Sequence, residues 1–175
     1  VDTERARELL ADLPFDGTPL ADPAPLLGCF GLEPASAVLP DAVPLVLRLV
    51  QDPAVGPLLS LRLGGPVADL LADPLTRTVP LTDADAAELV QGIRGAALLS
   101  GRDTAALEGL VHRLGRLGED LPEVAEVVLD PVLVGTSGAV VGGPGATVTV
   151  RLLPPGLDPE RLARRLPGDP DLHLR

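Results

Sequence analysis

The sequence predicts an α/β (α+β) protein in which a mixed β-sheet is covered by helices. Short apolar runs rich in Val and Leu alternate along the chain with amphipathic segments of helical period. The 19 Gly and 20 Pro residues fall mainly between these segments, where they mark turns. A length of 175 residues suits about one domain, whose core is large enough to need no disulfide or metal.

Two helices are predicted near the amino terminus. Either Asp2 or Thr3 can supply the N-cap of an amphipathic helix that ends at Pro14, because proline cannot continue a helix. Asp22-Pro23 begins a second, shorter helix with Asp as the cap and Pro in the first turn. Gly31 ends that helix.

Four strands are predicted in the next part of the chain. Residues 43–50, 58–63, 67–71 and 75–79 are short apolar runs of β-like composition. Turn-forming residues such as Gly64-Gly65-Pro66 separate them.

Two longer helices follow. Thr82 caps the first, which has acidic residues in its opening turn and ends at Gly95. Asp103 caps the second, whose Leu and Val residues repeat with the helical period up to Gly118.

The carboxyl-terminal part is predicted to return to strands. Residues 124–134 form a buried strand, and residues 139–141 and 146–152 are expected to pair as a closing hairpin. Residues 158–166 are predicted as a short helix before a loose tail. The expected organisation is therefore 1–40 for entry helices and first strand, 41–155 for the core, and 156–175 for the terminal helix and tail.

Charge and composition exclude several classes of function. The 25 acidic and 14 basic residues give a net charge of −11, which argues against nucleic-acid and membrane partners. Every basic residue is Arg, so lysine Schiff bases and a lysine clamp on phosphates are excluded. With two Phe and no Trp or Tyr, stacking on nucleic-acid bases is disfavoured. The single Cys29 is expected to be a buried structural thiol in a cytoplasmic protein.

Three motifs in a fixed order carry a family resemblance. Residues 50–57 have the sequence VQDPAVGP and lead to Leu63-Gly64-Gly65, residues 79–86 have the sequence VPLTDADA, and residues 121–126 have the sequence LPEVAE, followed by Asp130-Pro131. In this order they resemble the ATP-grasp domain of ADP-forming (NDP-forming) acyl-CoA synthetases. That domain also occurs fused to GNAT-type acetyltransferases. The resemblance covers most of the chain and implies an ATP-grasp-like carboxyl-side subdomain.

The chain departs from the family pattern at positions that handle phosphate and metal. The family's lid segment, with its ATP-binding Lys and a His-Lys-Ser sequence, is absent at residues 40–43. Arg62 replaces a family Gly, and Asp69 replaces a Glu. In the metal-binding motif, Val128 stands at the Asp position and Asp130 at the Asn position. An ATP-grasp site needs oxygen ligands for Mg²⁺ and cations for the phosphates, so these changes indicate a degenerate site.

The resemblance implies two vestigial sites and no catalytic residue. The nucleotide-binding candidates are Arg62, Gly64, Gly65 and Arg102, and the metal-binding candidates are Asp69 and Asp130. Plainer alternatives exist for these residues: a surface arginine at a strand end, a tight glycine turn, and aspartates in a loop and a turn. His112 lies beside the apolar stripe of its helix with no second His or Cys near it in sequence, which disfavours a zinc or catalytic role.

Two functional hypotheses follow. The first is a degenerate ATP-grasp domain that serves as a non-catalytic structural or regulatory module, with other domains of a CoA ligase or an acetyltransferase as partners. The second is one part of an active acetate/acyl-CoA ligase (ADP-forming) whose lid and CoA-binding domains are supplied elsewhere. ATP or ADP with Mg²⁺ would be the cofactor if the site is retained. An unrelated α/β scaffold is a third alternative.

Overall fold

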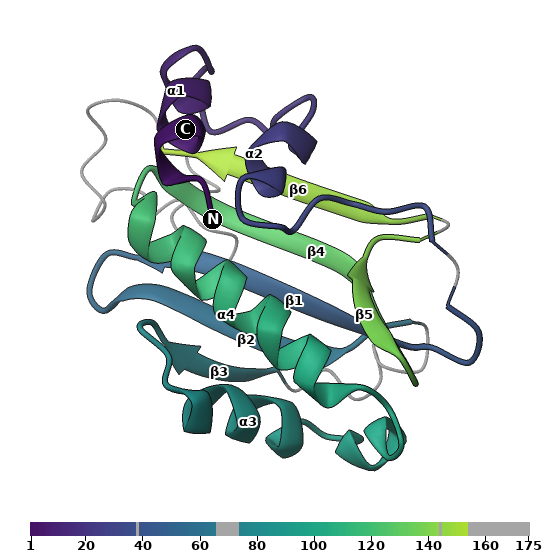
Figure 1. The fold of residues 1–175 in the computed structure, drawn as a ribbon. Helices are drawn as coiled ribbons and strands as arrows, with labels where there is room; N and C mark the ends of the chain where they lie inside the picture. Colours follow the sequence, from purple (N-terminus) through teal and green to yellow (C-terminus); the bar gives the residue numbers. More distant parts are fainter. Residues whose placement is uncertain (38, 66–73, 144, 154–175) are drawn as a thin grey trace, which may run out of the picture.

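A single six-stranded sheet organises the computed structural model, which describes residues 1–37, 39–65, 74–143 and 145–153 (Figure 1). Five strands lie in the order β3-β2-β1-β4-β5, and β6 pairs with β4. The strands are β1 (Val43–Asp52), β2 (Gly56–Leu63), β3 (Leu75–Thr78), β4 (Val124–Gly135), β5 (Gly138–Val141) and β6 (Thr147–Leu152). Every ladder between these strands is antiparallel, and Ala35 and Gly142 add an isolated parallel bridge.

The described helices gather on one face of the sheet. Figure 1 shows α4 lying across the strands, with α3 next to β3 and with α1 and α2 near β6. The helices are α1 (Thr3–Ala11), α2 (Ala24–Gly28), α3 (Asp83–Gly92), the 3₁₀ turn η2 (Ala96–Leu99) and α4 (Thr104–Asp120). The expected α/β (α+β) class is confirmed. No helix in the described part of the chain is long and apolar enough to cross a membrane.

The core lies between the sheet and these helices. Leu45, Leu47 and Leu49 alternate along β1 and are fully buried, whereas Arg48 between them is exposed. Successive side chains of a strand point to opposite faces, so this alternation separates a helix-covered face from an open face. Each buried leucine contributes about 1.5–3 kcal/mol relative to an exposed one. The described core therefore lies on the covered face, and none of the described helices packs on the other face, which we call the open face.

The predicted caps of the two longer helices are confirmed. The Thr82 hydroxyl accepts a hydrogen bond from the Asp85 N–H, and the Asp85 carboxylate accepts one from the Thr82 N–H. The Asp103 carboxylate accepts from the Ala106 N–H at the start of α4. Both contacts satisfy N–H groups that a helix cannot pair internally.

The expected closing hairpin is wrong. β5 pairs with the second half of β4, where Val132 faces Val141, and β6 pairs with the first half, where Val127 faces Val150. Because β4 is twelve residues long, one of its edges accommodates both short strands in series. The glycine-rich connection at residues 142–145 thus links two strands that run in the same direction.

Two predicted elements lie outside the described residues. These are the strand at 67–71 and the helix at 158–166. Asp69, a predicted metal ligand, is also outside them.

Candidate functional site

A pocket of about 270 Å³ lies on the open face of the sheet. Strands β1, β2 and β4 supply most of its lining, so it sits over the middle of the sheet, opposite the helices. The described residues that line it are Val46, Arg48, Ser60, Arg62, Pro74, Val128 and Asp130. The sheet brings two of the predicted site residues, Arg62 and Asp130, into one pocket.

Strand pairing explains how these two residues come to flank the pocket. Val46 faces Arg62 across the β1–β2 ladder. On its other side, the β1–β4 ladder shifts register between Leu45 and Leu47, so Asp130 lies beside Val46. Such bulges re-aim side chains near functional sites. Val46 itself is only 6% exposed, so it forms an apolar floor between a guanidinium and a carboxylate.

A charged network borders the pocket. Arg48 faces Val128 on β4, and Glu126 lies two residues before Val128 on the same face of that strand. Its Nε and Nη2 atoms donate to Glu126 Oε1 at 2.8 and 2.6 Å. Arg151 Nε on β6 lies 3.2 Å from Glu126 Oε2. The Glu126 side chain is 19% exposed. Its carboxylate pairs with two guanidiniums on the open face, those of Arg48 and Arg151.

Charged side chains of both signs lie on the open face. Among the described residues, the pocket and its border combine the guanidiniums of Arg48, Arg62 and Arg151 with the carboxylates of Glu126 and Asp130. The Nη1 atom of Arg62 also donates to the Leu63 carbonyl at 3.0 Å.

The described donor set does not suit Mg²⁺. That ion is normally held by carboxylates and phosphate oxygens, and one carboxylate, Asp130, lines this part of the pocket. Both oxygens of Glu126 already accept from or pair with arginines. Among the described residues, no group of three or more His, Cys, Asp or Glu side chains could hold a metal ion. The two guanidiniums of the lining also disfavour a cation.

The other predicted nucleotide-binding residues occupy separate positions. Gly64 follows β2, and its N–H donates to the Pro44 carbonyl at 2.8 Å. A Cβ on Gly64 would lie 3.3 Å from the Pro44 backbone, so a close approach explains this glycine. Gly65 has φ of +83°, the left-handed conformation that glycine adopts readily. The plainer explanation, a tight turn, accounts for both glycines.

Arg102 lies in the turn before α4. Its N–H donates to the Leu99 carbonyl, and the N–H of the next residue donates to the Gly135 carbonyl at the end of β4. Its Nε is buried without a hydrogen-bond partner among the residues that the structure describes. The backbone contacts place Arg102 at the end of the sheet, whereas Arg62 and Asp130 line the pocket over its middle.

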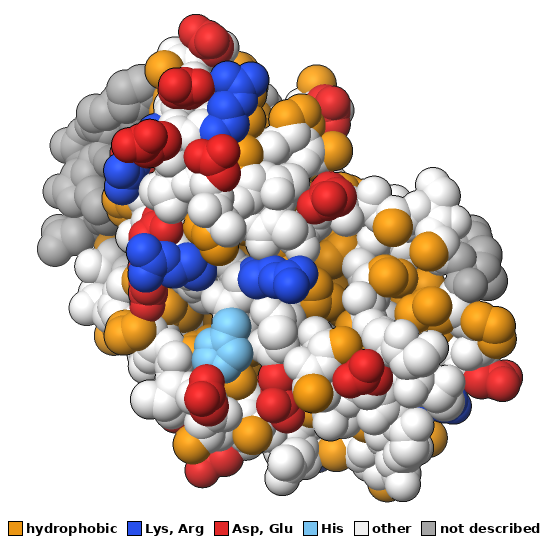
Figure 2. All heavy atoms as spheres, viewed as in Figure 1, with side chains coloured by type: hydrophobic (Ala, Val, Ile, Leu, Met, Phe, Trp, Pro, Cys, Tyr) orange, Lys and Arg blue, Asp and Glu red, His pale blue; other side chains and the backbone are white. Residues whose placement is uncertain are grey.

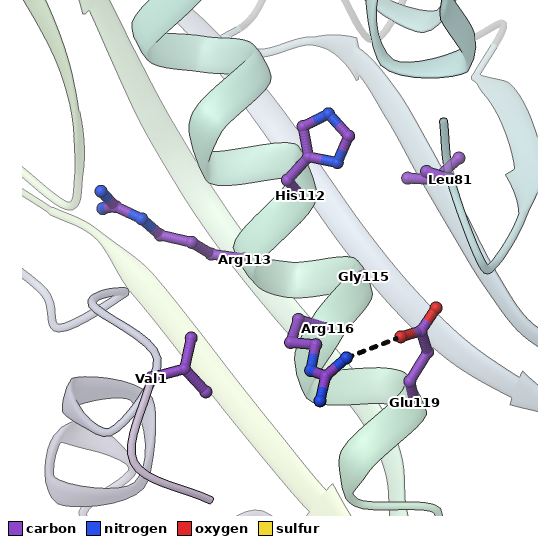
Figure 3. Close-up of a pocket in the computed structure, with 7 residues that line it drawn as sticks. All are labelled: Val1, Leu81, His112, Arg113, Gly115, Arg116 and Glu119. Carbon is purple, nitrogen blue, oxygen red and sulfur yellow. Dashed lines mark ion pairs between the residues drawn. The ribbon is translucent and has the colours of Figure 1, made fainter. Parts of the chain in front are cut away.

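A second hollow, of about 350 Å³, lies over the outer side of α4 (Figure 3). In Figure 3 Arg113 and Arg116 leave the helix in different directions, and His112 projects on the side of Leu81. Arg113 donates to the Gly31 carbonyl at 3.1 Å, and Arg116 pairs with Glu119 at 3.6 Å. The described residues of this hollow that carry charge are thus engaged within the chain.

Other features of the helix-covered face indicate that its residues have structural roles. His112 Nε2 lies 3.3 Å from an Asp83 carboxylate oxygen, a surface contact between α4 and α3. Figure 2 shows acidic and basic side chains interspersed over this face, without a single-sign field. Cys29, expected to be buried, is half-buried, and this burial raises the pKa of its thiol above the usual value. A raised pKa disfavours the reactive thiolate.

Sequence reasoning missed Arg48 and Arg151 on the open face, and it named Glu126 only within the LPEVAE motif and not as a site residue. Each of the three is a charged residue within a run of apolar or β-branched residues. Each lies on the face of its strand that points away from the helices. A charged residue in the middle of a strand run signals an open sheet face. Their mutual contact depended on strand order, which the sequence alone does not give.

Comparison with known proteins places this fold in a family. The ATP-grasp domain family matches residues 30–148, more than half of the chain. The chain is 28% identical over 109 residues to an acetate–CoA ligase (ADP-forming) I subunit beta of Pyrococcus furiosus, covering 59% of this chain and 47% of that protein. It is 33% identical over 103 residues to acetate–CoA ligase (ADP-forming) I of Archaeoglobus fulgidus, covering 55% of this chain and 15% of that protein.

Solved structures give the same result. The apo form of the dinucleotide-forming acetyl-coenzyme A synthetase 1 of Ca. Korarchaeum cryptofilum matches with a TM-score of 0.59 and 29% identity, covering 67% of this chain and 56% of that one. The same enzyme in complex with coenzyme A and Mg-AMPPCP matches with a TM-score of 0.57 and 30% identity, over 63% of this chain and 53% of that chain. The chain thus spans about half, or less, of the length of these relatives. It belongs to the ATP-grasp domain family and is a partial ATP-grasp domain related to ADP-forming acyl-CoA ligases.

Proposed function

We propose that this chain is a non-catalytic ATP-grasp module of an ADP-forming acyl-CoA ligase-like protein. One observation carries the proposal: the pocket that holds Arg62 and Asp130 combines two guanidiniums with one carboxylate and an apolar side chain, Val128. The family resemblance assigns a metal-binding Asp to the position of Val128. Phosphoryl transfer needs preorganised metal and cationic groups, and losing one such group typically costs about 10²–10³ in rate.

The role of the module is to pack against other domains and present its open face to them. The relatives it matches are longer ligases, one of them a beta subunit, so further domains are the expected partners. The family resemblance also names an acetyltransferase as a possible fusion partner. The Arg48–Glu126–Arg151 network gives such a partner a charged surface on the open face of the sheet.

A second candidate is one part of an active acid–CoA ligase (ADP-forming). The observation that favours it is the solved relative in complex with coenzyme A and Mg-AMPPCP, which shares 30% identity with this chain. In that case another chain or segment would supply the lid and the CoA-binding domains.

Calorimetric titration with ATP and ADP, with and without Mg²⁺, separates the two candidates. The non-catalytic module predicts that Mg²⁺ does not strengthen nucleotide binding, because the described pocket offers a single carboxylate. A working ligase half predicts micromolar, Mg²⁺-dependent binding that Asp130→Ala weakens. Val128→Asp is the matched variant that adds a carboxylate to the pocket. If nucleotide binding depends on Mg²⁺ in this variant and not in the wild type, the result would support loss of the metal site as the reason for inactivity.

A further inference from the structure

We infer that residues 16–20 form a strap along the edge of β6, and that Arg151 couples this strap to Glu126 and Arg48 on the open face of the sheet. Opening of the strap then loosens the charged network, and ordering of the network holds the strap closed. The inference goes beyond the proposed function and does not rest on it, because it follows from contacts within the chain.

The strap lies along the edge of β6 that β4 leaves unpaired. Among the described strands, β6 pairs only with β4. On its other side, Pro19 forms an isolated antiparallel bridge with Arg151, and the Leu20 N–H donates to the Val150 carbonyl at 2.8 Å. An unpaired strand edge is open to association with other chains, so the strap protects this edge where it contacts it.

The strap begins with a turn that its own residues stabilise. The Asp16 carboxylate accepts hydrogen bonds from the N–H and the hydroxyl of Thr18, at 2.9 and 2.6 Å. Gly17 between them has φ of +78°, a left-handed conformation that residues with a Cβ adopt at a cost. This turn presents the Gly17 carbonyl to β6, where it accepts a hydrogen bond from Arg151 Nη1 at 3.4 Å.

Arg151 joins the strap to the open face. Its Nη1 contacts the Gly17 carbonyl, and its Nε lies 3.2 Å from Glu126 Oε2. The other oxygen of Glu126 accepts from two nitrogens of Arg48, at 2.8 and 2.6 Å. The Arg151 side chain is 43% exposed, so both partners are needed to hold it in one rotamer. One guanidinium and one carboxylate therefore connect the strap to β1 across β6 and β4.

The strap is suited to open while the rest of the domain stays folded. Leu20 is buried, whereas Asp16, Thr18 and Pro19 are exposed. Segments with few buried apolar contacts open at a lower free energy than the core. Opening removes one of the two partners of Arg151 and so loosens the network. Linkage is reciprocal, so a partner domain that binds and orders the network also favours the closed strap.

The test is amide hydrogen exchange of the full chain. The Leu20 N–H reports opening of the strap, and the N–H of Leu49, a fully buried residue in the central strand β1, reports global unfolding. Arg151→Gln should lower the Leu20 protection factor about 3- to 10-fold, because the strap loses its contact with the guanidinium. Glu126→Gln should lower it about two- to fivefold, because Glu126 acts on the strap by positioning Arg151.

Arg5→Gln is the matched control for these variants. It removes the same guanidinium from an exposed pair with Glu8 on α1 and should leave the Leu20 protection factor unchanged. An unchanged or raised protection factor in folded Glu126→Gln would overturn the coupling. An equal loss of protection at Leu20 and Leu49 would also overturn it, because that result reports global unfolding rather than opening of the strap.

The reverse experiment strains the strap and observes the network. Gly17→Ala should speed solvent exchange of the Arg48 Nε–H, which donates to Glu126, about twofold or more in NMR spectra. Gly101→Ala is the matched control, since Gly101 also has a left-handed φ, of +73°, and a Cβ there would meet nothing within 4 Å. Equal exchange of the Arg48 Nε–H in Gly17→Ala and wild type would overturn the coupling, because a real linkage acts in both directions.

Discussion

Two glycines of α4 differ in what surrounds them. A Cβ on Gly118 would lie 2.9 Å from Leu49 Cδ1 and 3.2 Å from Pro57 Cβ, whereas one on Gly109 would meet nothing within 4 Å. Leu49 is fully buried, so it cannot move aside without disturbing the core. Gly118 therefore permits the close contact between α4 and the sheet, and Gly109 has no comparable packing role.

Alanine substitutions at these glycines should change stability in opposite directions. Gly118→Ala should lower the free energy of unfolding by about 1–2 kcal/mol, since overpacking exceeds the gain in helix propensity. Gly109→Ala should raise it by about 0.5–1 kcal/mol through propensity alone. Urea denaturation followed by circular dichroism measures both. Equal stabilisation by the two substitutions would show that α4 can shift away from β1 at little cost.

The start of α3 is a titratable element. Hydrogen bonds from the Thr82 hydroxyl and N–H hold the pKa of Asp85 below its ordinary value of 3.8. A folded-state pKa below the unfolded one means that the ionised carboxylate stabilises the fold above the unfolded pKa. That contribution is lost as the pH falls through the folded pKa.

Asp85→Asn should therefore be less stable than wild type at pH 7, and the difference should shrink as the pH falls from about 5 to below 3.8. Urea midpoints of the two proteins across this range test the prediction. Glu88→Gln is a suitable control on the same helix, because Glu88 lies outside the capping box and its side chain is 68% exposed. A difference between wild type and Asp85→Asn that stays constant with pH would assign the effect to shape rather than charge.

At the level of elements, local signals predicted most of the fold. The caps at Thr82 and Asp103 and the apolar run at residues 43–50 are local properties, and the structure confirms the two caps and a strand, β1, over that run. The pairing of β5 and β6 was not predictable in this way. Adjacent runs separated by glycines favour a hairpin, but the length of β4 offered each of them a longer-range partner.

The candidate site also combines features that the sequence predicts with contacts that depend on the fold. The sequence nominated Arg62 and Asp130 through family motifs, but their meeting across Val46 depends on β1 lying between β2 and β4. The Arg48–Glu126–Arg151 network joins three strands, and apart from Glu126 in the LPEVAE motif its members appear in the sequence only as single charges in apolar runs. Contacts between strands distant in sequence require the topology, so they became visible only in the fold.

For the molecule as a whole, added salt should stabilise the fold. The chain has a net charge of −11, so its acidic residues repel one another in the compact state. Raising the ionic strength from about 0.01 to 0.15 M shortens the Debye length from roughly 30 to 8 Å and screens this repulsion. The exposed ion pairs lost to screening, such as Arg5–Glu8, are each worth little. Net stabilisation by salt is therefore expected.

Urea is the appropriate denaturant for this measurement because it is uncharged and leaves the ionic strength fixed. The urea midpoint should rise with added NaCl, since screening weakens the repulsion among the acidic residues more than it weakens the exposed ion pairs. A midpoint that fell with added NaCl would show instead that ion pairs dominate the electrostatic contribution to folding.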